Sequence, residues 1–153
     1  WPKDPEYTEN HKLRRKFWGQ LLDKAKTKTQ LHAKVLPKKE NWVSASAGKR
    51  GLTFVYFIRM DDAQVELYID RNDAASNKIF FNTLLEHKVE IEKLFGCPLD
   101  WQLLPYKRAS RIRYVISDYG LKDQEHWDEL QDLLIDAMIR LERALRTYIH
   151  HLN

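Results

Sequence analysis

The sequence predicts an α+β domain, built from one antiparallel sheet of about four to five strands and three main helices. Two observations carry this prediction. Strand-like alternation occurs in neighbouring segments that short turns connect, which is typical of hairpins. Helical periodicity occurs in separate segments near the N-terminus, in the centre and at the C-terminus.

The composition is that of a globular chain of one domain. Of 153 residues, 43% are hydrophobic and 31% charged, and the net charge of +4 slightly favours an anionic partner. A single cysteine, Cys97, excludes an internal disulfide and favours a reducing cytoplasm. No apolar run approaches the ~18 residues of a membrane span, so we expect no membrane partner. Because the sequence begins with Trp1, we expect it to continue a longer polypeptide.

We predict a lead-in or linker over residues 1–7 and one α+β domain over residues 8–153. Thr8 is a plausible N-cap for the first helix, which buries an apolar stripe and carries a basic face that we expect to be solvated. Residues 29–51 form a long irregular stretch, of a length that is uncommon unless functional or partly ordered. A short strand is expected near Trp42–Ser46, and residues 48–51 predict a turn.

Two strands and a central helix follow. Residues 52–60 are apolar on both faces, which predicts a central strand, and Asp61-Asp62 supplies the hairpin turn. The next strand alternates between an apolar and a polar set, Val65, Leu67 and Ile69 against Glu66, Tyr68 and Asp70. Either Asp73 or Ser76 can cap the central helix, which Gly96 terminates.

A short strand within residues 99–104 precedes the densest basic cluster of the chain, over residues 107–117. As a strand, this cluster places Arg111 and Arg113 on one face, and we expect them to pair with Glu66 or Asp70. Asp123 can cap a final helix of roughly 27 residues. That helix is acidic first and basic later, in agreement with the helix macrodipole.

No complete catalytic motif is present. Glu86-His87-Lys88 has the carboxylate-to-lysine spacing of restriction-type nucleases, but it lies in a predicted helix. The six histidines form no tight metal-ligand pair, and Gly48-Lys49-Arg50-Gly51 has too few glycines for a phosphate loop. We therefore predict no cofactor and no metal, and for this domain alone we favour a non-catalytic role.

The remaining constellation is basic residues with an aromatic side chain among them. Arg and Lys neutralise phosphates, and exposed aromatic rings stack on bases. Alternatively, the tryptophan fills the core and the cations are only solvated. The candidate nucleic-acid-binding residues are Trp42, Lys49, Arg50, Lys107, Arg108, Arg111 and Arg113.

Several segments together resemble a family. They include Arg14-Arg15-Lys16-Phe17-Trp18, Asn41-Trp42-Val43-Ser44-Ala45, Val65-Glu66-Leu67-Tyr68-Ile69-Asp70, Asn77-Lys78, Leu99-Asp100-Trp101 and Lys107-Arg108-Ala109-Ser110-Arg111-Ile112. The pattern is similar to an uncharacterised prokaryotic domain-of-unknown-function family, whose members occur alone or C-terminal to restriction-endonuclease-like nuclease domains. The resemblance covers most of residues 8–149 and implies a DNA-related or defence role, without catalytic residues to transfer.

The leading hypothesis is an accessory domain that binds nucleic acid, with an upstream nuclease-like domain of the same protein as a further partner. The alternative is a protein-interaction or homodimerisation module, in which the long final helix pairs with its own copy. A second alternative is an enzyme with an unfamiliar site around Glu66, Asp70 and Arg111.

Overall fold

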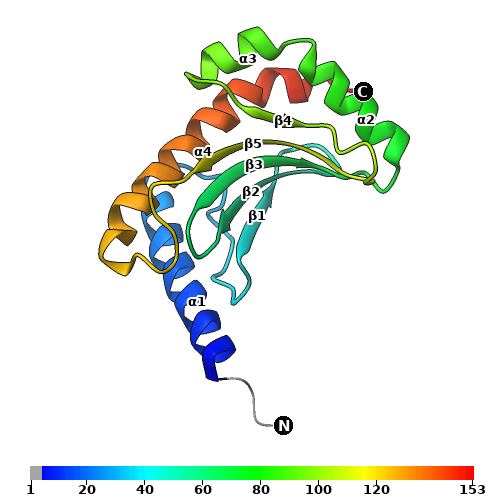
Figure 1. Cartoon of the computed structure of the whole chain (residues 1–153). Helices are drawn as coiled ribbons and strands as arrows, with labels where there is room; N and C mark the ends of the chain where they lie inside the picture. The colour runs from blue at the N-terminus through cyan, green and yellow to red at the C-terminus, as the bar shows by residue number, and fades with distance from the viewer. Residues whose placement is uncertain (1–4) are drawn as a thin grey trace.

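A five-stranded antiparallel sheet forms the centre of the structure, a computed structural model that describes residues 5–153 and the side chains of residues 9–153 (Figure 1). The strands lie in the order β1-β2-β3-β5-β4. The elements follow the chain as α1 (Pro5–Ala25), β1 (Trp42–Ser46), β2 (Leu52–Ile58), β3 (Ala63–Ile69), α2 (Ala74–Leu85), α3 (Lys88–Phe95), β4 (Asp100–Gln102), β5 (Ser110–Ile116), the 3₁₀ turn η1 (Gln124–His126) and α4 (Trp127–His150). The predicted α+β class is confirmed.

One face of the sheet is closed by α4. Its apolar stripe is fully buried against β2, β3 and β5, and α1 packs beside it, as Figure 1 shows. Phe17 and Trp18 of α1 and Trp127 of α4 join in edge-to-face ring pairs, each with centroids 5.3 Å apart. Since burying one large apolar side chain contributes about 1.5–3 kcal/mol, this layer contributes substantially to the folding free energy.

The sheet register separates apolar from polar side chains. In the pairing of β3 with β5, Leu67 lies opposite Ile112 and Glu66 lies opposite Arg113. Because successive side chains of a strand point to opposite faces, the apolar set meets α4 and the polar set meets the other face. The hairpin turn at Asp61-Asp62 and the strand Trp42–Ser46 are confirmed.

Three predicted boundaries differ from the structure. The first helix begins at Pro5, three residues before the expected cap Thr8, while residues 1–4 of the expected lead-in lie outside the described residues. The expected central helix is two helices, capped by Asp73 and ended by Gly96, whose φ is 103°. The break comes at His87, whose ring lies 4.7 Å from that of Tyr148 in a tilted arrangement, because α2 packs on the sheet whereas α3 packs on α4.

The last helix also starts later than expected. The side chain of Asp123 accepts a hydrogen bond from the Gly120 amide at 2.9 Å, and it makes no capping bond. Instead, a 3₁₀ turn leads into α4 at Trp127, whose indole donates to the Leu121 carbonyl at 2.9 Å. The need to bury the indole thus places the start of the helix, and Asp123 stabilises the preceding turn.

The stretch between α1 and β1 is packed against the core, which its irregular sequence did not show. His32 is 1% exposed, its Nε2 donates to the Phe54 carbonyl at 3.0 Å, and its ring lies 4.8 Å from that of Tyr56. The Trp18 indole donates to the Glu40 carbonyl at 2.9 Å and fastens the end of the same stretch. Burial lowers the pKa of His32 to about 4, so the imidazole is neutral at physiological pH.

The buried imidazole makes stability depend on pH. Between its unfolded value near 6.5 and about 4, the unfolded chain binds a proton that the folded chain excludes. The stabilisation is therefore complete above pH 6.5 and decreases as the pH falls towards 4, by about 3 kcal/mol in total. We expect His32→Gln, which retains an amide donor for Phe54, to flatten this part of the curve of unfolding free energy against pH.

Urea titrations at several pH values measure that curve, with His150→Gln as the control for losing an exposed imidazole. A His32→Gln protein that kept the wild-type slope between pH 6.5 and 4 would contradict the assignment.

Candidate functional site

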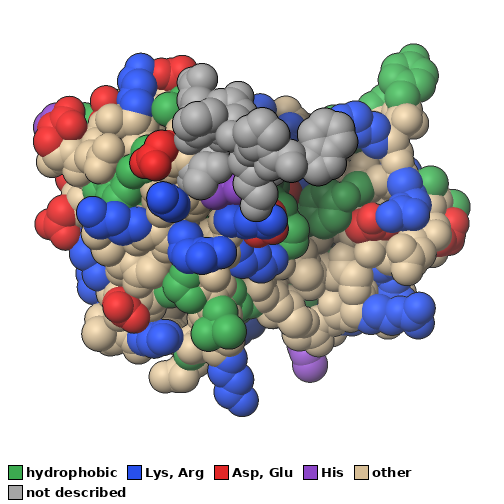
Figure 2. Space-filling model, turned by 90° about the horizontal axis from the view of Figure 1, so that it is seen from below, with side chains coloured by type: hydrophobic (Ala, Val, Ile, Leu, Met, Phe, Trp, Pro, Cys, Tyr) green, Lys and Arg blue, Asp and Glu red, His purple; other side chains and the backbone are tan. Residues whose placement is uncertain are grey.

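The sheet face opposite α4, called the open face here, carries a hollow. It has a volume of about 510 Å³ and lies over β1, β2 and β3. Its lining is aromatic and aliphatic on one side and acidic on the other, and consists of Trp42, Ser44, Gly51, Thr53, Val55, Phe57, Glu66, Tyr68 and Asp70. Figure 2 views the molecule from below and shows hydrophobic side chains around a recess, with Lys and Arg side chains nearby.

The strand alternation explains this lining. Trp42 and Ser44 of β1 alternate with the buried Val43, and Thr53, Val55 and Phe57 of β2 alternate with core residues. This also explains why β2 is apolar on both faces. One face enters the core, and the other forms the wall of the hollow.

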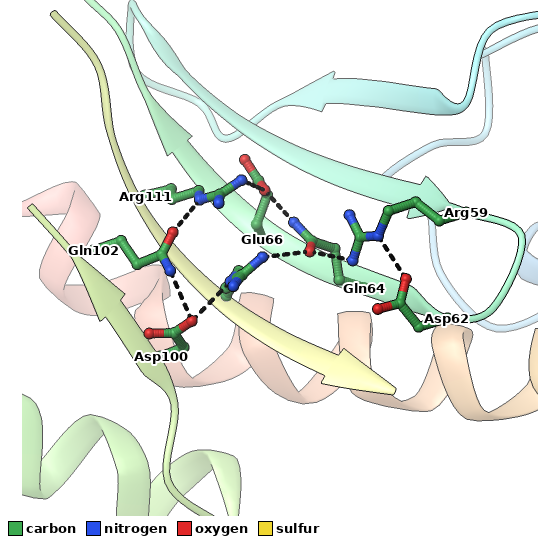
Figure 3. A network of polar contacts seen from close by, with 8 residues as sticks. Arg59, Asp62, Gln64, Glu66, Asp100, Gln102 and Arg111 are labelled. Carbon is green, nitrogen blue, oxygen red and sulfur yellow. Dashed lines mark hydrogen bonds and ion pairs between the residues drawn. The ribbon is translucent and has the colours of Figure 1, made fainter. Parts of the chain in front are cut away.

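A polar network adjoins the hollow on β3, β4 and β5 (Figure 3). We call it the arginine–carboxylate network, and its members are Arg59, Asp62, Gln64, Glu66, Asp100, Gln102, Arg111 and Arg113. Gln64 stands at its centre and is fully buried. Its Oε1 accepts from Arg59 Nη2 at 2.7 Å and from Arg113 Nη1 at 3.0 Å, and its Nε2 donates to Glu66 Oε1 at 2.5 Å.

The outer members hold the two arginines of β5. Arg111 Nε donates to Gln102 Oε1 at 2.5 Å, and its Nη1 lies 3.7 Å from Glu66 Oε1. Arg113 Nε donates to Asp100 Oδ2 at 2.8 Å. Both guanidinium groups are thus held by partners from two neighbouring strands, which restricts their motion in advance of any ligand.

Glu66 is the most unusual carboxylate of the open face. It is 1% exposed, and this burial raises the pKa of its carboxyl group against the opposing charges of Arg111, Arg113 and Arg59. One carboxylate oxygen holds the bonds to the network, while Figure 3 shows the other pointing away from it. The predicted pairing of Glu66 with an arginine of the late strand is confirmed.

Asp70 pairs differently from the prediction. It lies beyond the end of β3, and its two carboxylate oxygens accept from Arg108 Nε at 2.9 Å and Nη2 at 2.7 Å. Its expected partners Arg111 and Arg113 lie further along β5. The Arg108 guanidinium holds the pKa of Asp70 below its usual range. A backbone contact also fixes the position of Asp70, because the Asp70 amide donates a hydrogen bond to the Gly51 carbonyl at 2.8 Å.

The loop that carries Arg108 is attached to α2 by two polar side chains. Asn77 is fully buried and its Nδ2 donates to the Arg108 carbonyl at 3.1 Å. Lys78 Nζ donates to the carbonyls of Leu103, Leu104 and Ala109 and to Ser110 Oγ, at 2.7–2.9 Å. Periodicity alone did not identify Lys78, because a lysine on a helix is usually a solvated residue.

The predicted binding residues are only partly brought together. Trp42, Arg111 and Arg113 share the open face, with Arg108 at its edge. Trp42 is half-buried there, and Lys38 Nζ lies 3.5 Å from its ring centroid, so it does not fill the core. Lys49 instead donates to the Leu152 carbonyl, whereas Arg50 and Lys107 are exposed in a turn and a loop.

Glu66 and Asp70 line the same hollow, as the enzyme hypothesis requires, but each is engaged by an arginine. Over the described part of the chain, no group of three or more His, Cys, Asp or Glu side chains could hold a metal ion. Among these residues there is also no helix whose length and apolar character would suffice to cross a membrane.

Comparison with protein-family models matches residues 13–149 to the domain of unknown function DUF4268. The chain belongs to this family. The DUF4268 region covers the whole sheet and includes every member of the arginine–carboxylate network. Searches of curated proteins and of solved structures find no match.

Replacing the half-buried Lys78 ammonium of the DUF4268 domain tests how the Arg108 loop is held. We expect Lys78→Met to lower the free energy of unfolding by about 1–3 kcal/mol, because four oxygen acceptors lose their shared donor. Lys107→Met removes an exposed cation from the same loop and is the matched control. Denaturant unfolding of both variants is the measurement, and equal stability would show that the four bonds contribute nothing net.

Proposed function

We propose that this domain is a non-catalytic accessory module of a nucleic-acid-processing or defence-related protein and binds nucleic acid on its open face. The observation that carries the proposal is the shared location of aromatic side chains and arginines. Trp42, Phe57 and Tyr68 lie on β1, β2 and β3, and Arg111 and Arg113 lie on the adjoining β5. A sheet that offers rings for stacking beside cations for phosphates suits unpaired nucleotides.

The charge balance on this face predicts whether phosphate contacts or base stacking supply most of the binding free energy. Each of the arginines Arg59, Arg108, Arg111 and Arg113 already has a carboxylate partner, so the face is close to neutral. Binding then releases few counterions and depends more on stacking. This favours single strands, whose bases are accessible, over duplexes, which offer mainly phosphates.

The accessory role follows from the resemblance in sequence described above, to a family whose members occur alone or C-terminal to nuclease-like domains. In the proposal, cleavage belongs to an upstream nuclease-like domain of the same protein in the cytoplasm, and this domain holds the strand. The carboxylates of the open face support that division, because arginines and amides engage them in the arginine–carboxylate network and in the Asp70–Arg108 pair.

Fluorescence anisotropy with labelled single- and double-stranded DNA and RNA, at 50 and 200 mM salt, tests the proposal. We expect micromolar binding of single strands, with a salt slope corresponding to about two phosphate contacts. Trp42→Ala should weaken it about tenfold through lost stacking, and Arg108→Ala should reduce the salt slope. Arg143→Ala, an exposed position on α4, is the control. Unchanged affinity in folded Trp42→Ala and Arg108→Ala proteins would refute the assignment.

A second candidate function is protein interaction, favoured by apolar side chains on α2 and α3. Ile79 is 62% exposed, Val89 77% and Leu94 56%, and exposed apolar surface of sufficient extent marks interaction sites. The apolar stripe of α4 is buried in the core, and Arg140 and Arg146 pair within that helix. A homodimer would therefore use α2 and α3 rather than α4.

Sedimentation velocity at increasing protein concentration measures this association. If the second candidate is correct, we expect a dimer that Val89→Glu converts to a monomer, because a carboxylate would be buried without a partner. Lys88→Glu, at the neighbouring exposed position, is the control. A monomer at all concentrations would exclude self-association.

A further inference from the structure

The hollow on the open face has a hydrogen-bond acceptor at its acidic side. Glu66 is 1% exposed and belongs to the lining of the hollow. Its Oε1 accepts a hydrogen bond from Gln64 Nε2 and faces Arg111. Its second oxygen points away from the arginine–carboxylate network in Figure 3. No hydrogen bond within the described residues engages that second oxygen. A carboxylate oxygen accepts hydrogen bonds, so a ligand that binds it has to supply N–H or O–H donors.

The walls of the hollow indicate the shape of that ligand. The rings of Trp42, Phe57 and Tyr68 and the side chain of Val55 line it, and such surfaces bind planar groups. Its volume of about 510 Å³ is in the range of small-molecule sites, which is roughly 300–1,000 Å³. A planar ring with donors on its edge fits both the walls and the acceptor.

The surrounding charge argues against an organic cation. Aromatic walls with a carboxylate also suit ammonium groups. However, Arg111, Arg113 and Arg59 already oppose the negative charge of Glu66, so a cation beside Glu66 would lose its hydration for little electrostatic gain. A neutral ring that offers donors pays no such cost.

Among the nucleic-acid bases, guanine has the matching edge. Its Watson–Crick edge presents the N1–H and the N2 amino group side by side, two adjacent donors that the second oxygen of Glu66 can accept with its two lone pairs. Adenine and cytosine present one amino group beside an acceptor nitrogen, and uracil and thymine present one N–H between two acceptor oxygens. An acceptor oxygen of a base placed against Glu66 would be repelled by the carboxylate.

We propose that the hollow seats one unstacked guanine base of a single strand, with Glu66 accepting from its Watson–Crick edge. This inference rests on the proposed function, and adds base selection to it. Trp42 and Tyr68 would hold the ring, and Arg108 at the edge of the open face would meet the adjoining phosphate. The domain would then bind strands according to where a guanine is accessible.

The test compares labelled oligo(dA) strands that carry a single central dG, dA, dC or dT, by fluorescence anisotropy at 50 mM salt. We expect the dG strand to bind about tenfold more tightly than the others. Glu66→Gln should reduce this preference to below about threefold, because the glutamine oxygen is needed to accept from Gln64 and its amino group then replaces the acceptor that faces the base. Glu90→Gln, exposed on α3, is the matched control and should keep the preference.

Thermal melting checks that each variant is folded. The second variant is Thr53→Phe, in which a larger side chain on β2 fills the hollow. It should abolish the dG preference while the contacts at Arg108 remain. Equal affinity for the four strands, or a preference that survives both folded variants, would overturn the inference and leave nucleic-acid binding itself standing.

Guanosine and adenosine monophosphates, followed by saturation-transfer NMR, separate the two proposals. Guanosine monophosphate binding that Glu66→Gln removes, without binding of any strand, would support the hollow and overturn the proposed function. No binding of strands or nucleotides would overturn both.

Discussion

The pairing of β3 with β5 organises both the core and the open face. It brings two strands together that are separated in the sequence by two helices and a short strand. The same register that places Leu67 opposite Ile112 on the core side places Glu66 opposite Arg113 on the other side. A slip of one residue would expose the apolar set and bury the arginines against α4, so the hydrophobic core fixes the position of the polar network.

In the arginine–carboxylate network, the attraction between opposite charges has to offset the cost of removing those charges from water. Removing charges from water is unfavourable, and an ion pair recovers this cost only when its remaining hydrogen-bonding groups are satisfied. Gln64 and Gln102 satisfy them here, because their amide oxygens accept from arginines, two at Gln64 and one at Gln102, and each amide also donates to a carboxylate. The result is a nearly neutral surface with rigid cations, suited to selecting a ligand by shape and hydrogen bonding rather than attracting polyanions generally.

The edge of the open face depends on α2. Asn77 and Lys78 hold the backbone of the 103–110 loop, which in turn presents Arg108 to Asp70. Asp70 directly follows β3. Gly51 directly precedes β2, and its carbonyl accepts a hydrogen bond from the Asp70 amide. The hollow is therefore bordered by segments that the tertiary fold alone connects. Any change in how α2 packs on the sheet would move Arg108 relative to Trp42 and Tyr68.

The sequence by itself determined the α+β class, the strand at Trp42–Ser46, the turn at Asp61-Asp62 and the division of β3 and β5 into apolar and charged faces. These depend on local periodicity and turn chemistry, which a linear pattern contains. It also indicated the pairing of Glu66 with an arginine. Only the tertiary structure decided that Asp70 binds Arg108, that Lys78 holds a distant loop and that His32 is buried. It also decided that Lys49 contacts the C-terminal segment rather than the open face. Such contacts join residues far apart in the chain, and their energy depends on three-dimensional placement that no local pattern encodes.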